Sequence, residues 1–586
     1  MFNRTGNIIK EQFMKFFLPT VLMTMALSMS IVVDGIIVGN TLGSEALAAV
    51  NLVLPVTLLF NSVYVLIGVG GSALYSVALG QRQRRRAKQI FTVSTISMIT
   101  ISIFLCAVGF PLCHKIAEAL TVNAPNLTSL VYDYISIVVL AAPVLIVVPG
   151  LVYFIRTTGQ PRLASSVLII ANLVNLGLDL LYILVFNTGI GGAALATGTG
   201  YFVGLIIIIV GIIRTKELRF YRPLTDFFKF LLEISRMGLP NTINTCLNFF
   251  RLIFINAIVM VYLGSDGVTA FSVCTSCLSI VSMFVGGSAQ TMTPLLGILY
   301  GEKDYLGIKF TIKKAAMIVG ISTLTLLVVF ELLPTQITSL FGVVDPGQVA
   351  IAVEAIRIYT LSLPFMGILF IAMCLYPVFG HHNVSSMIAL LEGFLIVVPV
   401  AFLLSKVLGP VGIWLAFPLG EIITIGITFL VIKSIQKKDA ALKGIFLLDE
   451  KESGELLDIT MIQTVEQATA LSAEAIAYCK AHQVPELVAN KVGVALEEMT
   501  INTINAGGNS KKKDKYIDIR IIATLEELII SFRDNGKPRN PLNEKESQGK
   551  FGGIELILAI SKEVTYDNIL GMNSCIVKID SNGKEN

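Results

Sequence analysis

Long apolar segments recur through most of the chain, and short polar connections separate them. A run of about 18 or more apolar residues is long enough to cross a bilayer as a helix. Such segments are expected at residues 13–39, 48–79, 87–111, 129–153, 163–186, 191–213, 235–263, 266–299, 309–332, 352–378, 384–406 and 410–433. The pattern predicts a polytopic all-α membrane protein with twelve helices, followed by a more polar tail.

The composition agrees with this class. Hydrophobic residues make up 54% of the chain and charged residues only 14%, whereas soluble domains carry about 25% charged residues. The polar first residues, MFNRTGNIIKEQFMKF, differ from a secretory signal peptide, and the apolar run after them is too long for one. We interpret that run as an uncleaved first span. The eight cysteines are scattered, mostly in apolar segments, which favours packing over metal binding.

Lysine and arginine concentrate in alternate connections. These are the N-terminal tail, QRQRRRAK (81–88), residues 156–162, 214–236 and 301–314, and the stretch from residue 433 onward. The intervening connections hold only Lys115 and Lys406. Because basic residues favour the cytoplasmic side of a membrane, we expect a multi-pass protein of the plasma membrane with both termini in the cytoplasm.

The apolar region contains an internal repeat. Leu18-Pro19 recurs as Leu239-Pro240, LGSEALAA (42–49) as LGSDGVTA (263–270), and Ala142-Pro143 as Leu363-Pro364, all at one spacing. GGAALA (191–196) matches VGIWLA (411–416) at a spacing one residue shorter. The repeat predicts two six-helix lobes, residues 1–220 and 221–438. Because six is even, both lobes enter the membrane from the same side, and a pathway is expected between them.

Polar residues inside the first-lobe segments are candidates for function. Asp34 lies well inside the first segment, and NLVNLGLDLLY (172–182) places Asn172, Asn175 and Asp179 on one helical face. A charge inside a bilayer costs roughly 2.5 kcal/mol or more, so such groups normally face a cavity or a partner. Their oxygens suit a proton relay or a Na⁺ site. The alternatives are interhelical hydrogen bonds by the asparagines and an Asp34 that reaches interfacial water.

The second lobe carries different charges. Ile255 occupies the position equivalent to Asp34, so the acids of the first lobe do not follow from the repeat alone. Arg251 and Glu392 lie in apolar segments of the second half. They could line the cleft, pair with each other, or extend to the cytoplasmic interface.

The tail after Lys438 is a separate domain. Residues 439–455 have the composition of a linker, and residues 456–586 alternate between helical and strand patterns, which predicts an α/β sandwich. Three stretches of the tail suggest chemistry, although each is weak alone. Glu498 and Asn502 are four residues apart on one helix, RDNGKP places Asp534 and Gly536 after a strand, and QGKFGGIEL places Gly552 and Gly553 before a helix, where phosphates bind.

The first 435 or so residues resemble the multidrug and toxic compound extrusion (MATE) family. The matching stretches include VDGIIVGNTLGSEALAAVNLVLPV, RTTGQPRLASS, NLVNLGLDLLYILVFNTGIGGAALAT, GGSAQTMTPLLGILYGEKD and VGIWLAFP. The resemblance implies an antiporter driven by H⁺ or Na⁺ that exports organic cations and drugs. It also implies that Asp34 and Asp179, with Asn175 beside the latter, take part in cation binding.

The tail resembles the histidine-kinase-like ATPase superfamily, especially anti-sigma-factor serine kinases. The resemblance implies an Mg-ATP site with Glu498 as general base, Asn502 as Mg²⁺ ligand and Asp534 as the adenine-reading residue. Gly536 belongs to the first glycine box, and Gly552 and Gly553 to the second. The chain departs from the family at Glu555, where a glycine is usual, and a carboxylate there could repel the phosphates.

We therefore expect a cation-coupled exporter of organic compounds with a cytoplasmic ATP-binding regulatory domain. One alternative is a lipid-linked sugar flippase of the same fold. Another is a membrane-anchored serine/threonine kinase whose tail acts on a protein partner. No GxxxxGK[ST] loop occurs in the chain, which argues against an ABC-type pump. Membrane lipid and a small-molecule substrate are the expected partners, and nucleic acid is not.

Overall fold

The computed structural model describes residues 4–122, 124–215, 218–222, 226–343, 345–449, 455–506, 516–523, 527–536, 538, 540, 542 and 553–580. The first lobe contains α1 (Asn7–Leu42), α2 (Ser44–Tyr64), α3 (Gly70–Gly80), α4 (Arg84–Leu120), α5 (Thr128–Leu140), α6 (Ala142–Thr157), α7 (Pro161–Leu180) and α8 (Gly189–Thr215). The second lobe contains α9 (Phe227–Gly301), α10 (Tyr305–Leu332), α11 (Pro334–Leu340), α12 (Pro346–Thr360), α13 (Leu363–Val378), α14 (His382–Leu390), α15 (Val397–Leu408) and α16 (Pro410–Lys438). Short π-helical turns, η1 (Val65–Val69), η3 (Leu181–Val185) and η4 (Leu391–Leu395), continue α2, α7 and α14.

The predicted apolar segments correspond to these helices. Among the described residues, eight helices are long and apolar enough to cross a membrane, or up to ten if each of two bent pairs is one span. The long helix α9 covers two predicted segments, and its backbone leaves the helical region at Gly264, between them. The prediction of a polytopic helical protein is confirmed.

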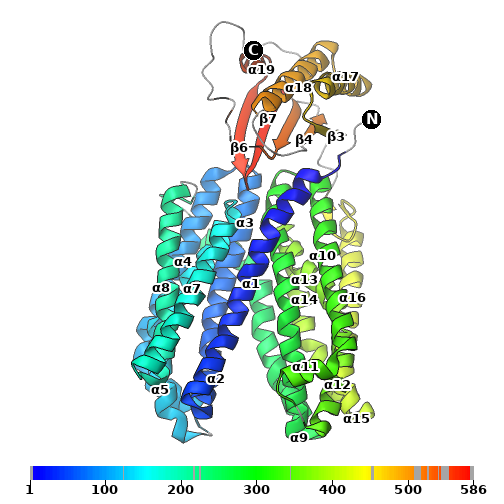
Figure 1. Ribbon diagram of the computed structural model, residues 1–586. Coiled ribbons are helices and arrows are strands. Elements are labelled where there is room, and N and C mark those ends of the chain that lie inside the picture. The colour runs from blue at the N-terminus through cyan, green and yellow to red at the C-terminus, as the bar shows by residue number, and fades with distance from the viewer. Residues whose placement is uncertain are drawn as a thin grey trace.

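The two lobes lie side by side, and α1 packs against both α7 and α9 (Figure 1). At the end of the bundle that carries the C-terminal domain, α3 and the end of α9 meet backbone to backbone. A Cβ atom on Gly80 would overlap the carbonyl of Ile298, and one on Gly301 would overlap the carbonyl of Val77. The lobes are therefore closed against each other at this end, which we call the domain end.

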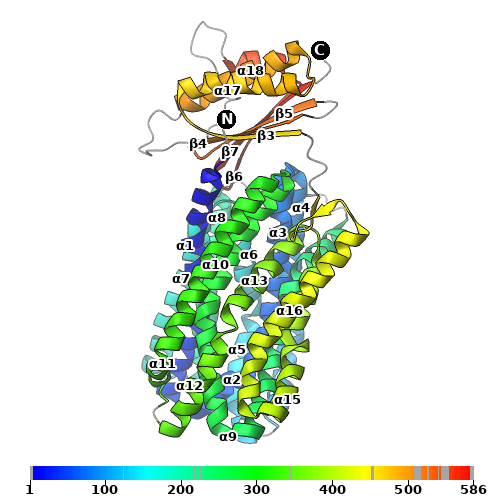
Figure 2. The ribbon, with the colours of Figure 1, turned by 90° about the vertical axis from the view of Figure 1, so that its right-hand side faces the viewer.

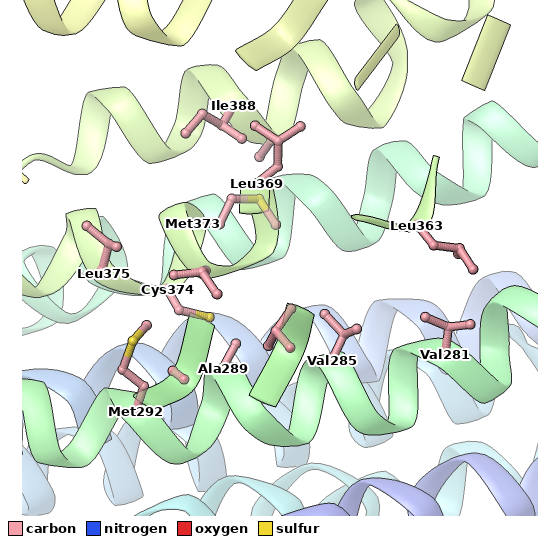
Figure 3. Close-up of a cluster of buried hydrophobic side chains, with 14 of the residues drawn as sticks. Val281, Val285, Ala289, Met292, Leu363, Leu369, Met373, Cys374, Leu375 and Ile388 are labelled. Carbon is pink, nitrogen blue, oxygen red and sulfur yellow. The ribbon is translucent and has the colours of Figure 1, made fainter. Parts of the chain in front are cut away.

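The bundle has two apolar cores, one centred on each lobe, and the core of the second lobe also takes in Ile8 and Phe13 of α1. In the second lobe, buried side chains of α9, α13 and α14 form one cluster, in which Val285 and Met292 of α9 lie near Met373 and Cys374 of α13 (Figure 3). The cysteine packs here as a small apolar residue, as expected from its sequence context. Burial of these side chains holds α13 and α14 against α9.

The C-terminal domain is a sheet covered by helices on one face. Its strands are β3 (Glu455–Ile462), β4 (Tyr516–Ala523), β5 (Glu527–Asp534), β6 (Glu563–Ile569) and β7 (Met572–Asp580), in the antiparallel order β3-β4-β5-β7-β6. The helices α17 (Val465–Ala481), α18 (Glu486–Ala506) and α19 (Gly553–Ile560) lie on the face turned away from the bundle (Figure 2). The predicted α/β sandwich is confirmed.

The two faces of this sheet follow from the alternation of side chains along each strand. In β5, Leu528, Ile530 and Phe532 belong to the apolar core under the helices. Arg533, one residue on, points to the opposite face and bonds to the bundle. One face is thus an ordinary core, and the other is a polar surface directed at the membrane part.

Residues in the predicted linker form a small hairpin, β1 (Leu442–Lys443) and β2 (Leu448–Asp449). It is tied to the second lobe, because Tyr376 donates to the carbonyl of Ile445 at 2.8 Å and His381 Nε2 lies 3.0 Å from the carbonyl of Leu447. Leu447 is buried against that lobe. The first part of the connection therefore belongs structurally to the bundle.

One residue counted among the basic connections is placed differently by the structure. Arg156 was expected in the connection 156–162, but α6 continues to Thr157 and buries it at 2% exposure. Its guanidinium lies over the ring of Tyr153, 5.1 Å from the centroid. The apolar run simply extends further than hydropathy indicates, because a helix can bury an arginine stem against aromatic side chains.

Candidate functional site

The two acidic residues singled out in the first lobe lie together. Asp34 of α1 and Asp179 of α7 interact directly through their side chains. Asn175 donates its amide to Asp179 Oδ2 at 3.2 Å and to Thr197 Oγ1 of α8 at 3.2 Å. Asp179 is 1% exposed and Asn175 is 2% exposed. The structure thus brings together the three residues that the sequence indicated for cation binding.

This site holds more buried oxygen atoms than donors. Asp34 Oδ1, Asp179 Oδ1 and Asn172 Oδ1 are buried without a hydrogen-bond partner among the described residues. The amide nitrogen of Asn172 donates elsewhere, to the carbonyl of Ala26 at 2.7 Å. Two carboxylates in contact repel each other unless a proton or a cation is shared between them. The arrangement therefore fits a bound proton or a hard cation.

Arg251 and Glu392 of the second lobe also lie together. Nη1 of Arg251 donates to the main-chain carbonyl of Glu392 at 3.1 Å, and the guanidinium lies 5.9 Å from the ring centroid of Phe417. Both residues line a cavity of about 340 Å³. The sequence analysis missed a third member, Glu421 of α16, which is 4% exposed and interacts with both. Its position in the apolar run PLGEIITIG was the signal that could have identified it.

In the C-terminal domain, Glu498 and Asn502 lie one turn apart on α18. Both are half-buried and lie next to the helix face that packs on the sheet, which includes Leu496 and Met499. The neighbouring Glu497 accepts a hydrogen bond from Thr469 of α17 at 3.3 Å. Glu497 therefore points toward α17. Glu498 and Asn502 lie one above the other on a neighbouring side of α18.

Asp534 ends β5 and is fixed by its neighbours. Its Oδ1 accepts from the amide of Gly536 at 2.7 Å and from Nδ2 of Asn573 in β7 at 3.0 Å. Burial raises the pKa of Asp534, although these two hydrogen bonds oppose the shift. Because both bonds fall on Oδ1, the Oδ2 atom can accept a further hydrogen bond, as reading an adenine amine would require.

The second glycine box is described only in part. Gly552 lies outside the described residues, and Gly553 is the first residue of α19, which packs against α18. Glu555, the departure from the family pattern, lies in the first turn of α19 and is exposed. An exposed carboxylate remains hydrated, so its repulsion of a nearby phosphate is screened.

The polar face of the sheet is docked onto the domain end of the bundle (Figures 1 and 2). The centre of this contact is Asp304, in the connection between α9 and α10, which is 0% exposed. Arg4 bonds both of its carboxylate oxygens at 2.7 Å, and Arg533 of β5 bonds Oδ2 at 2.8 Å. Burial alone would raise the pKa of Asp304, but the guanidinium groups of Arg4, Arg520 and Arg533 outweigh it and hold that pKa well below its usual range.

Further contacts surround this centre and join the strands of the sheet to the bundle. Arg4 also reaches Asp458 of β3 at 3.0 Å, and Arg533 bonds Glu302. Arg520 of β4 donates to the main-chain carbonyls of Glu302 at 3.3 Å and Lys303 at 3.0 Å. The C-terminal domain therefore contacts the second lobe through the connection between α9 and α10.

A separate set of contacts joins the C-terminal domain to the first lobe. Arg82, before α4, donates to Ser574 Oγ of β7 at 2.7 Å, and Arg84 lies 2.5 Å from Asp567 of β6. Gln12 of α1 donates to the carbonyl of Leu570, and Gly159, before α7, closely approaches the same residue. The sheet thus bridges both lobes. The sequence analysis missed this surface, although the charges that alternate with apolar residues in YIDIRII and SFRD were a signal for it.

Comparison with known proteins supports this division. The MatE family model matches residues 19–181 and 240–403, one match in each lobe. The model of the histidine kinase-like ATPase domain matches residues 462–576. These ranges agree with the two predicted resemblances.

Individual relatives and solved structures resemble the membrane part. Multidrug export protein MepA of Staphylococcus aureus (strain MRSA252) is 22% identical over 406 residues, which is 68% of this chain and 88% of the relative. Its counterpart from Staphylococcus haemolyticus is 22% identical over 397 residues, covering 67% and 87%. A structure described as the outward-facing conformation of a multidrug resistance MATE family transporter superposes with a TM-score of 0.68 at 20% identity, covering 75% of this chain and 100% of the other. A MOP superfamily transporter from Pyrococcus furiosus gives the same values.

The family match covers more than half of the chain, and its two halves coincide with the two lobes. The solved structures share the architecture of the membrane part. The chain therefore belongs to the MatE family and carries a histidine kinase-like ATPase domain at its C-terminal end.

Proposed function

We propose that the protein is an antiporter that exports small organic compounds, chiefly organic cations, in exchange for H⁺ or Na⁺. The Asp34–Asp179 pair carries this proposal. It is an oxygen-rich site inside the membrane part in which one buried oxygen of each carboxyl group has no hydrogen-bond donor among the described residues, and intramembrane acids of this kind mark ion and proton pathways. The multidrug export relatives support the substrate class.

We propose that the domain end faces the cytoplasm of the cell and that the bundle lies in the plasma membrane. The basic connections at Arg82, Gly159 and Lys303 all contact the C-terminal domain and therefore share one end of the bundle. The excess of lysine and arginine in these connections supports a cytoplasmic position.

We propose that the C-terminal domain binds Mg-ATP. Asp534 would bind the adenine amine, Asn502 would hold Mg²⁺, and Gly553 would lie at the phosphates on the N-terminus of α19. Glu498, one turn before Asn502 on α18, would act as the general base. The bound Mg-ATP would supply a transferable phosphoryl group or, without transfer, binding energy that moves the domain. The geometry fits, since Asp534 is preorganised by Gly536 and Asn573.

We propose that nucleotide binding regulates transport through strand β5. Asp534 and Arg533 are consecutive, and they point to opposite faces of the sheet because side chains alternate along a strand. Arg533 bonds Asp304 and Glu302 of the bundle, and Asn535 bonds Glu11 of α1. A shift of the end of β5 on nucleotide binding would therefore reach both lobes directly.

The export function is tested with the purified full-length protein in liposomes. An imposed H⁺ gradient or an imposed Na⁺ gradient should drive uptake or release of a fluorescent organic cation against its own gradient. One of the two ions should suffice. Absence of transport under both gradients would contradict the proposal.

The nucleotide site is tested by Asn502→Ala. Loss of the side-chain oxygen should weaken binding of Mg-ATP by about tenfold or more, because a charge-assisted metal contact is worth more than about 1.4 kcal/mol. Binding is measured by calorimetry. Asn490→Ala is the matched control, since Asn490 lies exposed on the same helix, and it should keep wild-type affinity. Equal affinity of the Asn502 variant and wild type would reject this placement.

Coupling between the two parts is tested by Arg533→Gln. Mg-ATP should change the export rate of the wild-type protein in liposomes and should have no effect on this variant, although both should bind Mg-ATP with similar affinity. Lys578→Gln serves as the control, because the Lys578–Glu563 pair is partly exposed, and its response to Mg-ATP should persist. A nucleotide response retained by Arg533→Gln would show that coupling does not run through this contact.

A further inference from the structure

The C-terminal sheet crosses the line along which the two lobes meet at the domain end (Figure 1). Strands β6 and β7 contact the first lobe at Arg82 and Arg84, and strands β4 and β5 contact the second lobe at the connection between α9 and α10. Strand β5 pairs with β7 over its full length. Such a ladder cannot lengthen without losing hydrogen bonds. The sheet therefore fixes the separation between the two sets of contacts.

The lobes are also in direct contact along α3, η1 and α9, and we call this contact the seam. Besides the close approaches at Gly80 and Gly301, a Cβ atom on Gly238 of α9 would overlap the carbonyl of Leu66 in η1. Ile234 of α9 belongs to the apolar core of the first lobe, and Val77 of α3 belongs to that of the second. A transporter that takes up substrate at the domain end must separate its lobes along this seam.

A buried charge opposes this closed arrangement. Arg156 of α6 is 2% exposed and lies against the second lobe, where it interacts electrostatically with Cys374 of α13. Its Nε and Nη1 atoms are buried without a hydrogen-bond partner among the described residues. Arginine stays charged, and a charge buried without hydrogen bonds is costly. Because separation of the lobes would hydrate Arg156, another contact must offset this cost to keep the seam closed.

The two sets of contacts that the sheet makes differ in burial. In the second-lobe set, the side chains of Asp304 and Arg533 are 0% and 8% exposed. In the first-lobe set, those of Arg82, Asp567 and Arg84 are 16%, 15% and 55% exposed. Exposed ion pairs stabilise little, whereas a buried charge that loses its partner is left uncompensated. The first-lobe set should therefore separate first, and the domain should stay with the second lobe.

We propose that the docked C-terminal domain is an autoinhibitory brace, which holds the two lobes together at the domain end. Release of β6 and β7 from the first lobe is the step that allows the seam to open. The brace offsets the cost of burying Arg156, and substrate enters from the domain end only after its release. This role rests on the proposed export function, because a transporter needs the seam to open, and it does not require phosphoryl transfer.

A reversible cross-link between the domain and the first lobe tests the brace. Arg84→Cys and Asp567→Cys are combined in the full-length protein, because Arg84 Nη2 and Asp567 Oδ1 lie 2.5 Å apart in the more exposed set of contacts. A short bis-methanethiosulfonate reagent joins the two cysteines, and a reductant removes it. Cys106 and Cys246 are replaced by serine in all samples, since the other native cysteines are buried. We call this protein the bridging variant.

Opening of the seam is measured by hydroxyl-radical oxidation of Val77 and Ile234, which are 8% and 0% exposed. The bridging variant is placed in liposomes with a fluorescent organic cation under an imposed H⁺ or Na⁺ gradient. Oxidation of both residues should be slower in the linked than in the reduced protein, because water reaches them only when the lobes separate. Export should fall in proportion to the linked fraction and return on reduction.

The matched control combines Glu563→Cys with Lys578→Cys. These two residues face each other on β6 and β7, so their link stays within the domain and should change neither oxidation nor export. If the bridging variant does not fold, Arg82→Cys with Ser574→Cys repeats the test at the same set of contacts.

The oxidation readout decides the proposal. Equal oxidation of Val77 and Ile234 in the linked and reduced bridging variant would overturn the brace, whatever the export rate does. Slower oxidation in the linked protein, with no export in either state, would support the brace and reject the export function instead.

Discussion

Asp34→Asn should reduce gradient-driven export in liposomes to the level of protein-free controls. The amide has nearly the shape of the carboxylate, but it neither takes up a proton nor supplies the negative charge that a cation needs. Asp179 would then face an amide rather than a second carboxyl group, and the pair could no longer exchange a shared cation. Initial rates under separate H⁺ and Na⁺ gradients are the measurement.

The control for this variant is Asp133→Asn. Asp133 is an exposed aspartate of α5 in the same lobe, so its replacement tests for a general effect of lost charge. It should leave export within about twofold of wild type, as expected for a surface substitution. Wild-type export by Asp34→Asn under both gradients would show that Asp34 is not part of the coupling site.

Asp304→Asn should loosen the docking of the sheet onto the connection between α9 and α10. Arg4 and Arg533 would stay buried and charged, and each would lose the carboxylate of Asp304 as a partner. Breaking a buried ion pair in this way costs about 3–5 kcal/mol. Asparagine can still cap α10, as Asp304 does by accepting from the amide of Gly307 at 2.8 Å. The expected result is therefore faster hydrogen exchange in β3, β4 and β5 with little change in the helices of the bundle.

Glu563→Gln is the control for docking. The Glu563–Lys578 pair has a distance of 2.8 Å but is 50% and 34% exposed, and exposed pairs contribute about 1 kcal/mol or less. Its exchange pattern should match wild type. If the Asp304 variant also matches wild type, then the interface does not depend on this carboxylate.

The pH dependence of docking follows from the same charges. The pKa of Asp304 is held well below its usual range, so its contribution is present above the ordinary carboxyl pKa and is lost only as the pH falls through the lowered value. Burial raises the pKa of Asp458, although the positive charges of Arg4 and Arg520 act in the opposite direction. The free-energy cost of burying the ionised Asp458 therefore disappears when acidification protonates it. Docking through Asp304 should therefore stay constant between about pH 5 and 8.

Much of the architecture follows from the sequence because hydrophobic periodicity is local. A membrane span must be long and apolar, so the helices could be placed from hydropathy. Successive side chains in YIDIRIIAT and ELIISFRDNG alternate between the two faces of a sheet, and these segments form the adjacent strands β4 and β5. The repeat predicted two lobes from a handful of residues, such as Leu18-Pro19 and Leu239-Pro240. Even the candidate pair of Asp34 and Asp179 was visible, because a carboxylate in an apolar run is costly and therefore rare.

The tertiary structure decided which of these charges meet. Arg4, Asp304 and Arg533 are hundreds of residues apart in the chain, and none is unusual in its local context. Only the docking of the sheet onto the domain end makes them one buried cluster. Glu421 likewise gains meaning only beside Arg251 and Glu392. Sequence patterns therefore determined the elements and the faces they bury, whereas the meeting of distant charges depends on three-dimensional packing, which no local pattern encodes.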